Sequence, residues 1–484
     1  MIRSFFRHSF LYSLVNIINK GIGILLTPLY TRVFEPADYG LLDWVLIIGS
    51  VIIGIANFQI SQGLGYYFSH AEGEGEKKSI AKTTLTFIVF SSSIALILIL
   101  IFPDFLRNLI IGENVNMEVS EYLIILLGGY ILMTGLSGHF DNLLKWTLKA
   151  KLRFLSNVIQ SFTTIGLIAY LVLVADFGVE GVLMGRIIGQ LVAVILVGYI
   201  TRPYLGFGFN VFYFTQMIRF SAPLVLVSLS TLITSYADRI FIKSFIGYDT
   251  MGLYGIGFKF ASILKMMFIG ITGALSPLIL NNYKDKGTPK EIVRIFEFVL
   301  VVSTVGIVTM SLFSHEILQL LTTPSYYAGY IFIPFVAATF MFDQIFQFAP
   351  GLTIAKKTKT LSVIFTGKLI LNLILNYFAV IHFGAVGVAA ASLIVSILAL
   401  VLVVRLSQKD YFIPYAFGRY ILAILVGGGV IGVIYNIQIE NYWFLLSAKI
   451  GSIALYGGFL ILIGVLNPKK QFGQLIGSFT KKKG

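Results

Sequence analysis

The sequence contains no cysteine, which excludes disulfide bonds, thiolate nucleophiles and cysteine-ligated metal ions. Charged residues are also scarce. They make up 12% of the 484 residues, about half the share found in an ordinary soluble domain, whereas hydrophobic residues make up 57%. This composition predicts an integral membrane protein rather than a soluble one.

Histidine is rare, and its five copies are scattered along the chain without an HExxH motif or a pair at metal-ligand spacing. The chain also lacks the GxxxxGK[ST] loop that holds the phosphates of ATP. We therefore expect no metal site, no cofactor and no ATP-driven activity in this chain. The histidines are His8, His70, His139, His315 and His382.

Long apolar runs dominate the sequence. A bilayer core of about 30 Å needs roughly 20 apolar residues per helix, and fourteen stretches are long enough. The predicted fold is therefore all-α, with about 14 transmembrane helices. The predicted spans are 9–31, 41–66, 83–103, 120–142, 155–176, 179–200, 219–246, 252–281, 292–314, 328–352, 361–382, 385–406, 416–436 and 443–465.

Lysine and arginine are unevenly distributed between the predicted loops. The loops on the side of the N-terminus hold most of the 36 cations, whereas those on the other side hold Arg32, Arg107 and Lys243. Because cationic loops stay in the cytoplasm, we predict a multi-pass protein of the cytoplasmic (inner) membrane with both termini in the cytoplasm. The same imbalance accounts for most of the net charge of +14 without a nucleic-acid partner.

The second half of the chain repeats the first. Residues 155–196 align without a gap on residues 361–402, so that DFGVEGVLMG corresponds to HFGAVGVAAA. The offset of 206 residues spans six helices, an even number, so both copies have the same orientation in the membrane. The repeat predicts two six-helix lobes around a central cavity that opens to each side in turn, as in a transporter. The predicted domains are an N-lobe at 1–200, a cytoplasmic linker at 201–216, a C-lobe at 217–408, and two added helices with a basic cytoplasmic tail at 409–484.

Two stretches at corresponding places in the two halves are more specific than the apolar spans. The first is LLTPLYTRVFEPADYGLLDW at 25–44, where Pro36 requires a turn and the next helix restarts at Gly40. The second is ADRIFIKSFIGYDTMGLYGIG at 237–257, with a turn at Asp249 and a restart at Gly252. Both are predicted to be the tips of membrane hairpins.

Ionisable side chains inside the predicted spans are the candidates for function, because a charge in a bilayer is costly unless it faces a partner or water. Most of them are cationic, and a cationic cavity suits an anionic cargo and repels cationic drugs. Structural alternatives stay open, since Arg239 can pair with Asp238 or a neighbouring helix, and Lys449 can extend to the membrane surface. These residues are Lys20, Asp141, Arg186, Asp238, Arg239, Lys259, Lys265, Asp343, Lys368 and Lys449.

Four residues are candidates for coupling transport to an ion. Asp141 and Asp343 lie near the cytoplasmic ends of predicted spans, where a carboxylate either binds a proton or cation or is simply solvated. Asp238 lies inside the seventh span. His139, two residues from Asp141, is a candidate proton relay.

With these hairpins, fourteen helices and the GVEG/GAVG repeat, the whole chain resembles the bacterial polysaccharide flippases. These are the O-antigen repeat-unit translocases of the multidrug/oligosaccharidyl-lipid/polysaccharide exporter superfamily. The resemblance implies a transporter rather than an enzyme. Its cargo would be an undecaprenyl-diphosphate-linked oligosaccharide, moved from the cytoplasmic to the outer leaflet by ion-coupled alternating access, for O-antigen or capsule biosynthesis. Other implied partners are membrane lipids, a polysaccharide polymerase and a chain-length regulator.

The resemblance also implies a cationic lumen, carried here by the hairpin residues Arg32, Arg239, Lys243 and Lys259. A diphosphate and a polar oligosaccharide do not cross hydrocarbon unaided, and a water-filled cationic cleft removes that penalty. Together with the cations inside the spans, the candidate substrate-binding residues are Lys20, Arg32, Arg186, Arg239, Lys243, Lys259, Lys265 and Lys368.

Three other functions stay open. A lipid II flippase would share the fold and the charge pattern and differ only in its substrate. A drug/cation antiporter of the same superfamily would carry acidic residues deep in the N-lobe, where this chain has Lys20 and Arg186. A membrane polysaccharide polymerase would be an enzyme with its working residues in a large outer loop, and no predicted outer loop is large.

Overall fold

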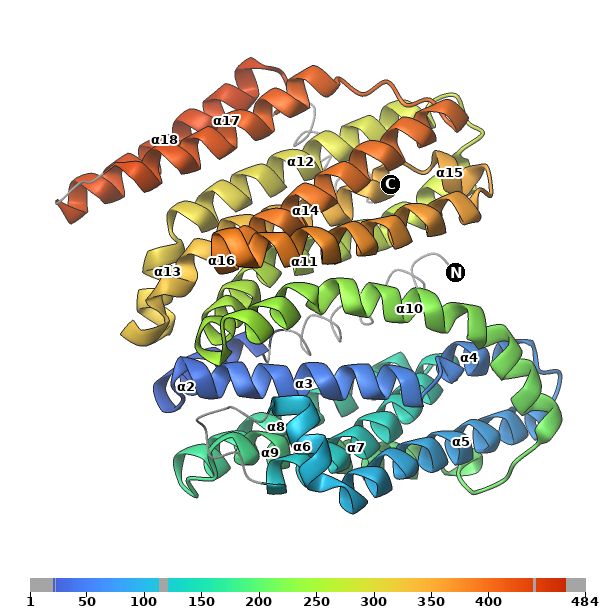
Figure 1. Ribbon diagram of the computed structural model, residues 1–484. Coiled ribbons are helices and arrows are strands. Elements are labelled where there is room, and N and C mark those ends of the chain that lie inside the picture. Colours follow the sequence, from blue (N-terminus) through green and yellow to red (C-terminus); the bar gives the residue numbers. More distant parts are fainter. Residues whose placement is uncertain (1–20, 22, 113–120, 438–440, 467–484) are drawn as a thin grey trace, which may run out of the picture. The chain divides into compact units, whose positions relative to one another are not determined.

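In the computed structural model, the described residues are 21, 23–112, 121–437 and 441–466. Every regular element among them is a helix and none is a strand, which confirms the predicted all-α fold (Figure 1). The helices are α2 (Thr27–Val33), α3 (Pro36–Ala56), α4 (Ile60–His70), α5 (Glu74–Ile101), α6 (Pro103–Ile111), α7 (Glu121–Trp146), α8 (Ala150–Leu173), α9 (Gly178–Ile200), α10 (Val211–Phe245), α11 (Tyr248–Asn282), α12 (Thr288–Leu312), α13 (Ser314–Leu321), α14 (Ile333–Ile345), α15 (Gly351–Ile354), α16 (Thr358–Asp410), α17 (Phe417–Asn436) and α18 (Tyr442–Leu462), with 3₁₀ helices η1 (Arg202–Tyr204), η2 (Pro324–Phe332) and η3 (Phe346–Phe348).

A helix is present at each predicted span from the second to the fourteenth. The first predicted span lies largely outside the described residues, and Lys20 lies outside them as well. Among the described residues, eleven helices are long and apolar enough to cross a membrane; they count α16 once and include neither α11 nor the first span. Two predicted spans are joined in α16, which is kinked at Gly384, where φ is +62°. Glycine accepts this left-handed conformation because it has no Cβ.

The second predicted span, 41–66, consists of two helices rather than one. Helix α3 ends at Ala56 and α4 begins at Ile60. Between them, Phe58 and Gln59 have φ angles of 44° and 51°, a left-handed conformation that costs a non-glycine residue roughly 1–2 kcal/mol. The break is bonded to α10, where Ser228 Oγ lies 2.6 Å from Gln59 Nε2.

The chain divides into two compact units, Met1–Gly252 and Leu253–Gly484, with the boundary inside α11. In the first unit, α10 packs against α3, α4 and α5. The predicted lobes at 1–200 and 217–408 were defined by the sequence repeat rather than by packing, and they stay a prediction.

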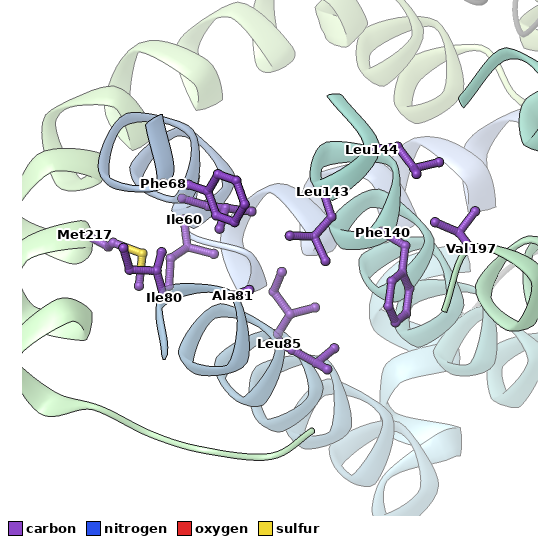
Figure 2. Packing of buried hydrophobic residues seen from close by; sticks show 12 residues of the cluster. Ile60, Phe68, Ile80, Ala81, Leu85, Phe140, Leu143, Leu144, Val197 and Met217 are labelled. Carbon is purple, nitrogen blue, oxygen red and sulfur yellow. The ribbon is translucent and has the colours of Figure 1, made fainter. Parts of the chain in front are cut away.

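The core of the first unit includes a cluster from α4, α5, α7, α9 and α10, which Figure 2 shows. Glycines let these helices approach closely. A Cβ on Gly63 would lie 3.0 Å from the Met217 Cα, and the Trp146 indole packs directly on Gly65. Small residues of this kind hold membrane helices together by packing, because lipid offers no hydrophobic driving force between them. The buried members are Ile60, Leu64, Phe68, Ile80, Ala81, Leu85, Ile88, Phe140, Leu143, Leu144, Val197 and Met217.

The second unit combines close glycine contacts with side-chain hydrogen bonds. Gly351 lies against the backbone of Ser407, whose hydroxyl donates to the Ala349 carbonyl at 2.7 Å. Helices α17 and α18, the added pair, pack against each other and against α12. The Tyr456 hydroxyl of α18 donates to the Ala423 carbonyl of α17 at 3.0 Å.

Candidate functional site

The first predicted hairpin turns between α2 and α3. Pro36 is the first residue of α3, where its fixed φ suits a helix start and its missing N–H leaves no bond unmade. The Glu35 N–H donates to the Asp38 carboxylate at 3.3 Å, so these acidic residues support the start of the helix. The turn at Pro36 is therefore confirmed.

The two hairpin tips are in direct contact at their restart glycines. A Cβ on Gly40 would overlap the Tyr248 carbonyl and lie 3.1 Å from the Gly252 nitrogen. A Cβ on Gly252 would overlap the Pro36 carbonyl. Only glycine at both positions permits this backbone approach, so the two restarts predicted from the sequence meet within the first unit.

Arg239 on α10 forms an ion pair with Asp43 on α3, with Nε 3.3 Å from Oδ2. The arginine is 5% exposed, and its guanidinium lies 5.8 Å from the centre of the Tyr236 ring. The carboxylate comes from a neighbouring helix, one of the two structural alternatives considered for Arg239. Asp43 was not among the predicted site residues, although it lies inside the first hairpin motif.

Lys243 lies one helical turn after Arg239. Its ammonium is 4.9 Å from the Trp44 ring centre and 5.5 Å from the Tyr248 ring centre, close enough for cation–π attraction to both. The end of α6 completes this site. The Trp44 indole donates to the Ile110 carbonyl at 2.7 Å, and the Tyr248 hydroxyl donates to the Ile111 carbonyl at 3.1 Å. Carbonyls at a helix C-terminus lack partners within the helix, so these bonds hold α6 against both hairpins.

Two further candidates belong to the first unit. Arg186 on α9 is partly buried and interacts with the Tyr30 hydroxyl of α2, near Tyr130 and Tyr39. Arg32 is exposed at the end of α2. The structure thus places Arg186 among tyrosines and Arg32 at the surface of its unit.

Three candidate cations belong to the second unit. Lys265 lies 4.6 Å from the Phe340 ring centre. Lys259 is partly buried on α11, and the adjacent Phe260 is buried. Lys368 on α16 forms an ion pair with Asp343 on α14. The expectation that all these cations line one cavity stays a prediction.

The ion-coupling candidates have different surroundings. Asp141 on α7 receives two hydrogen bonds from the Arg153 guanidinium of α8, at 2.6 and 2.7 Å, and one from Asn157 at 3.1 Å. His139 is 1% exposed, and neither of its ring nitrogens has a hydrogen-bond partner among the described residues. Asp238 is partly buried beside Arg239. An ion-coupling role for these residues and for Asp343 stays a prediction.

Other polar contacts were not foreseen. Lys449 on α18 pairs with Glu316 on α13 instead of extending to the surface. Two buried asparagines of α16 are linked to its second half, where Asn372 Nδ2 donates to the Ser392 hydroxyl at 2.8 Å. The NxxxN spacing at Asn372 and Asn376 in an apolar span was the available signal. No group of three or more His, Asp or Glu side chains suited to a metal occurs within the described ranges.

Two family models match the sequence. The model described as "Polysaccharide biosynthesis protein" matches residues 5–282, and the model described as "MatE" matches residues 223–378. Among curated proteins, none matches the chain.

Several solved transporter structures share the fold. The lipid II flippase MurJ, in an inward closed conformation, is 16% identical with a TM-score of 0.73, and the match covers 93% of this chain and 98% of MurJ. A multidrug resistance MATE family transporter of the MOP superfamily, inward-facing, is 15% identical with a TM-score of 0.67, covering 82% of this chain and 94% of its own. A variant of the Vibrio cholerae MATE transporter VcmN is 16% identical with a TM-score of 0.56, covering 84% and 95% respectively.

The first family model covers more than half of the chain, and the structural matches extend over most of its length. The protein therefore belongs to the polysaccharide biosynthesis protein family and is a multi-pass membrane protein that shares its fold with MurJ and the MATE transporters.

Proposed function

We propose that the protein moves an undecaprenyl-diphosphate-linked oligosaccharide from the cytoplasmic to the outer leaflet of the cytoplasmic membrane, for the assembly of a surface polysaccharide such as O-antigen or capsule. The family to which it belongs is one of polysaccharide biosynthesis proteins. A protein of the same fold is a lipid II flippase, so this fold serves the flipping of a lipid.

The surroundings of Lys243 and Arg186 support the proposal of an anionic substrate. Among the described residues, neither has a carboxylate within ion-pair distance. Lys243 faces the aromatic rings of Trp44 and Tyr248, and Arg186 faces the Tyr30 hydroxyl. A cation that no carboxylate neutralises attracts an anion, and a diphosphate accepts a bidentate contact from arginine and a point contact from lysine.

Arg239 is proposed to bind the same diphosphate in another conformation. Its guanidinium is held by Asp43 here, and a phosphate oxygen would take the place of the carboxylate. The phosphate would again neutralise Arg239, whereas Asp43 would lose its counter-ion and would need water or a proton in that state. Closure of the hairpin tips and cargo binding would then compete for Arg239, which gives the two states the different affinities that transport requires.

The experiment is depletion of the protein in its own host, followed by measurement of the membrane leaflet on which lipid-linked repeat units accumulate. We expect accumulation on the cytoplasmic leaflet. Wild-type protein should relieve the block, and Lys243→Ala should fail to relieve it although the protein is made. Lys409→Ala is the matched control, since this lysine lies in the last turn of α16 and should complement fully.

Other outcomes would change the assignment. Single repeat units on the outer leaflet would show that translocation proceeds without this protein, and a polymerase or ligase role would replace the proposal. The likeness to MurJ favours lipid II as the second candidate cargo. Rescue of cells depleted of their lipid II flippase, without any change in surface polysaccharide, would support that candidate instead.

A further inference from the structure

The segment between α9 and α10, residues 201–210, carries its apolar side chains on the outside. The Phe207 ring is 76% exposed and the Phe212 ring, at the start of α10, is 65% exposed. Exposed apolar groups of this size mark a surface that contacts something other than water. The exposed large apolar residues here are Tyr199, Leu205, Phe207, Phe209, Val211 and Phe212.

The exposure is fixed by hydrogen bonds on the other side of the segment. The Gly208 N–H donates to the Thr86 hydroxyl at 3.2 Å, and the Asn210 N–H donates to the Thr83 hydroxyl at 3.1 Å, so the backbone is bonded to α5. The Tyr204 hydroxyl donates to Glu74 at 3.0 Å. Burial and this carboxylate raise the pKa of the Tyr204 hydroxyl above its usual value. The rings therefore point outward because the backbone is held against α5.

The position of the segment relative to the bilayer follows from its neighbours. Helices α9 and α10, which it joins, are both long and apolar enough to span a membrane. The two threonines that hold it, Thr83 and Thr86, lie at the predicted cytoplasmic end of the third span. A connection anchored there lies at the level of the lipid headgroups, where aromatic side chains are enriched in membrane proteins.

Two cations lie along the segment. The Arg202 guanidinium is 5.6 Å from the Tyr199 ring centre. The Lys82 side chain runs along the segment, with its Cε 3.3 Å from the Cβ position of Gly206. Apolar rings flanked by arginine and lysine match the boundary between acyl chains and phosphates, which such side chains occupy together.

We propose that residues 199–212 form an interfacial anchor, a surface whose partner is the lipid of the cytoplasmic leaflet. The phenylalanine rings enter the region between headgroups and acyl chains, while Arg202 and Lys82 contact lipid phosphates. The segment that connects the two halves of the repeat is thereby attached to the bilayer as well as to α5.

The absence of cysteine makes a direct test available, because a single introduced cysteine is the only labelling site. A nitroxide is attached to Phe207→Cys and, separately, to Phe212→Cys, and each protein is placed in vesicles of zwitterionic and anionic phospholipid. Collision rates with oxygen, which concentrates in lipid, and with a water-soluble nickel chelate are measured. The references are Glu72→Cys in the exposed turn before α5 and Phe162→Cys on the exposed face of α8.

We expect the oxygen-to-nickel collision ratio at both test positions to be several-fold above that at Glu72→Cys and below that at Phe162→Cys. A ratio equal to that at Glu72→Cys would overturn the proposal, since the rings would then lie in water and be open to a cytoplasmic protein. A ratio equal to that at Phe162→Cys would also overturn it, because the segment would lie inside the acyl chains. Both test side chains are exposed, so neither substitution disturbs the packed core.

Discussion

Gly40 and Gly252, 212 positions apart in the sequence, lie so close that a Cβ on either would overlap the backbone of the opposite hairpin. The contact joins the tips of α2–α3 and α10–α11. It also explains why both hairpins restart with glycine, since each residue supplies the space that the other needs.

The first prediction concerns this contact. Gly40→Ala should lower the stability of the folded protein by about 1–3 kcal/mol, because the new methyl group forces the hairpins apart. Gly432→Ala on α17 is the control, since a Cβ there meets nothing within 4 Å. Thermal unfolding in detergent, followed by size-exclusion chromatography, compares the two. Equal midpoints would show that the hairpin tips are not in contact in the detergent-solubilised protein.

The second prediction concerns Asp43 and Arg239. Asp43→Ala and Arg239→Ala should each destabilise the protein, by up to about 3–5 kcal/mol, because each leaves a buried charge without its counter-ion. The double variant should be more stable than the sum of the two losses predicts. Full additivity would mean that the pair does not form. If the double variant is stable but does not transport, Arg239 is needed for substrate binding and not only for stability.

The third prediction concerns the added helices. Lys449→Ala should destabilise the docking of α18, because Glu316 on α13 would be left partly buried and charged. Combining it with Glu316→Gln should recover much of the loss. Limited proteolysis within α17 and α18 reports the docking. An unchanged cleavage pattern in Lys449→Ala would show that the ion pair does not contribute to the docking of these helices.

The fourth prediction concerns the break between α3 and α4. Ser228→Ala removes the hydroxyl that meets the Gln59 amide and should cost about 1 kcal/mol of stability. Gln59→Ala should cost a similar amount, and the two losses should not add, since either one breaks the same bond. Losses that do add would assign the two side chains to different interactions.

Hydrophobicity alone located the helices, because a membrane span needs a long apolar run and little else. The sequence showed that both hairpins restart with glycine, and the structure shows why: the backbones of the two hairpins approach each other closely at Gly40 and Gly252. The partner of Arg239 was not predicted, since Asp43 is distant in sequence and only the packing of α3 on α10 brings the two together.

The break at Asn57–Gln59 escaped prediction for a different reason. Neither glycine nor proline occurs between Asn57 and Gln62, and apolar residues continue on both sides, so the local signal is that of one helix. Two hydrogen bonds to α10 override that local preference: Ser221 donates to the Gln59 carbonyl, and Ser228 accepts from the Gln59 side-chain amide. The periodicity of apolar residues carries no information about such tertiary hydrogen bonds.

The break gives α10 two separate attachments to the α3–α4 segment. On one side of it lies the ionic contact at Asp43, and on the other lies the close-packed contact of Gly63 with Met217. If α3 and α4 were one continuous helix, both contacts with α10 would have to break together. Because the helix is interrupted at Phe58 and Gln59, the contact at Asp43 can break while the contact of Gly63 with Met217 stays in place, and the interruption would then act as a hinge.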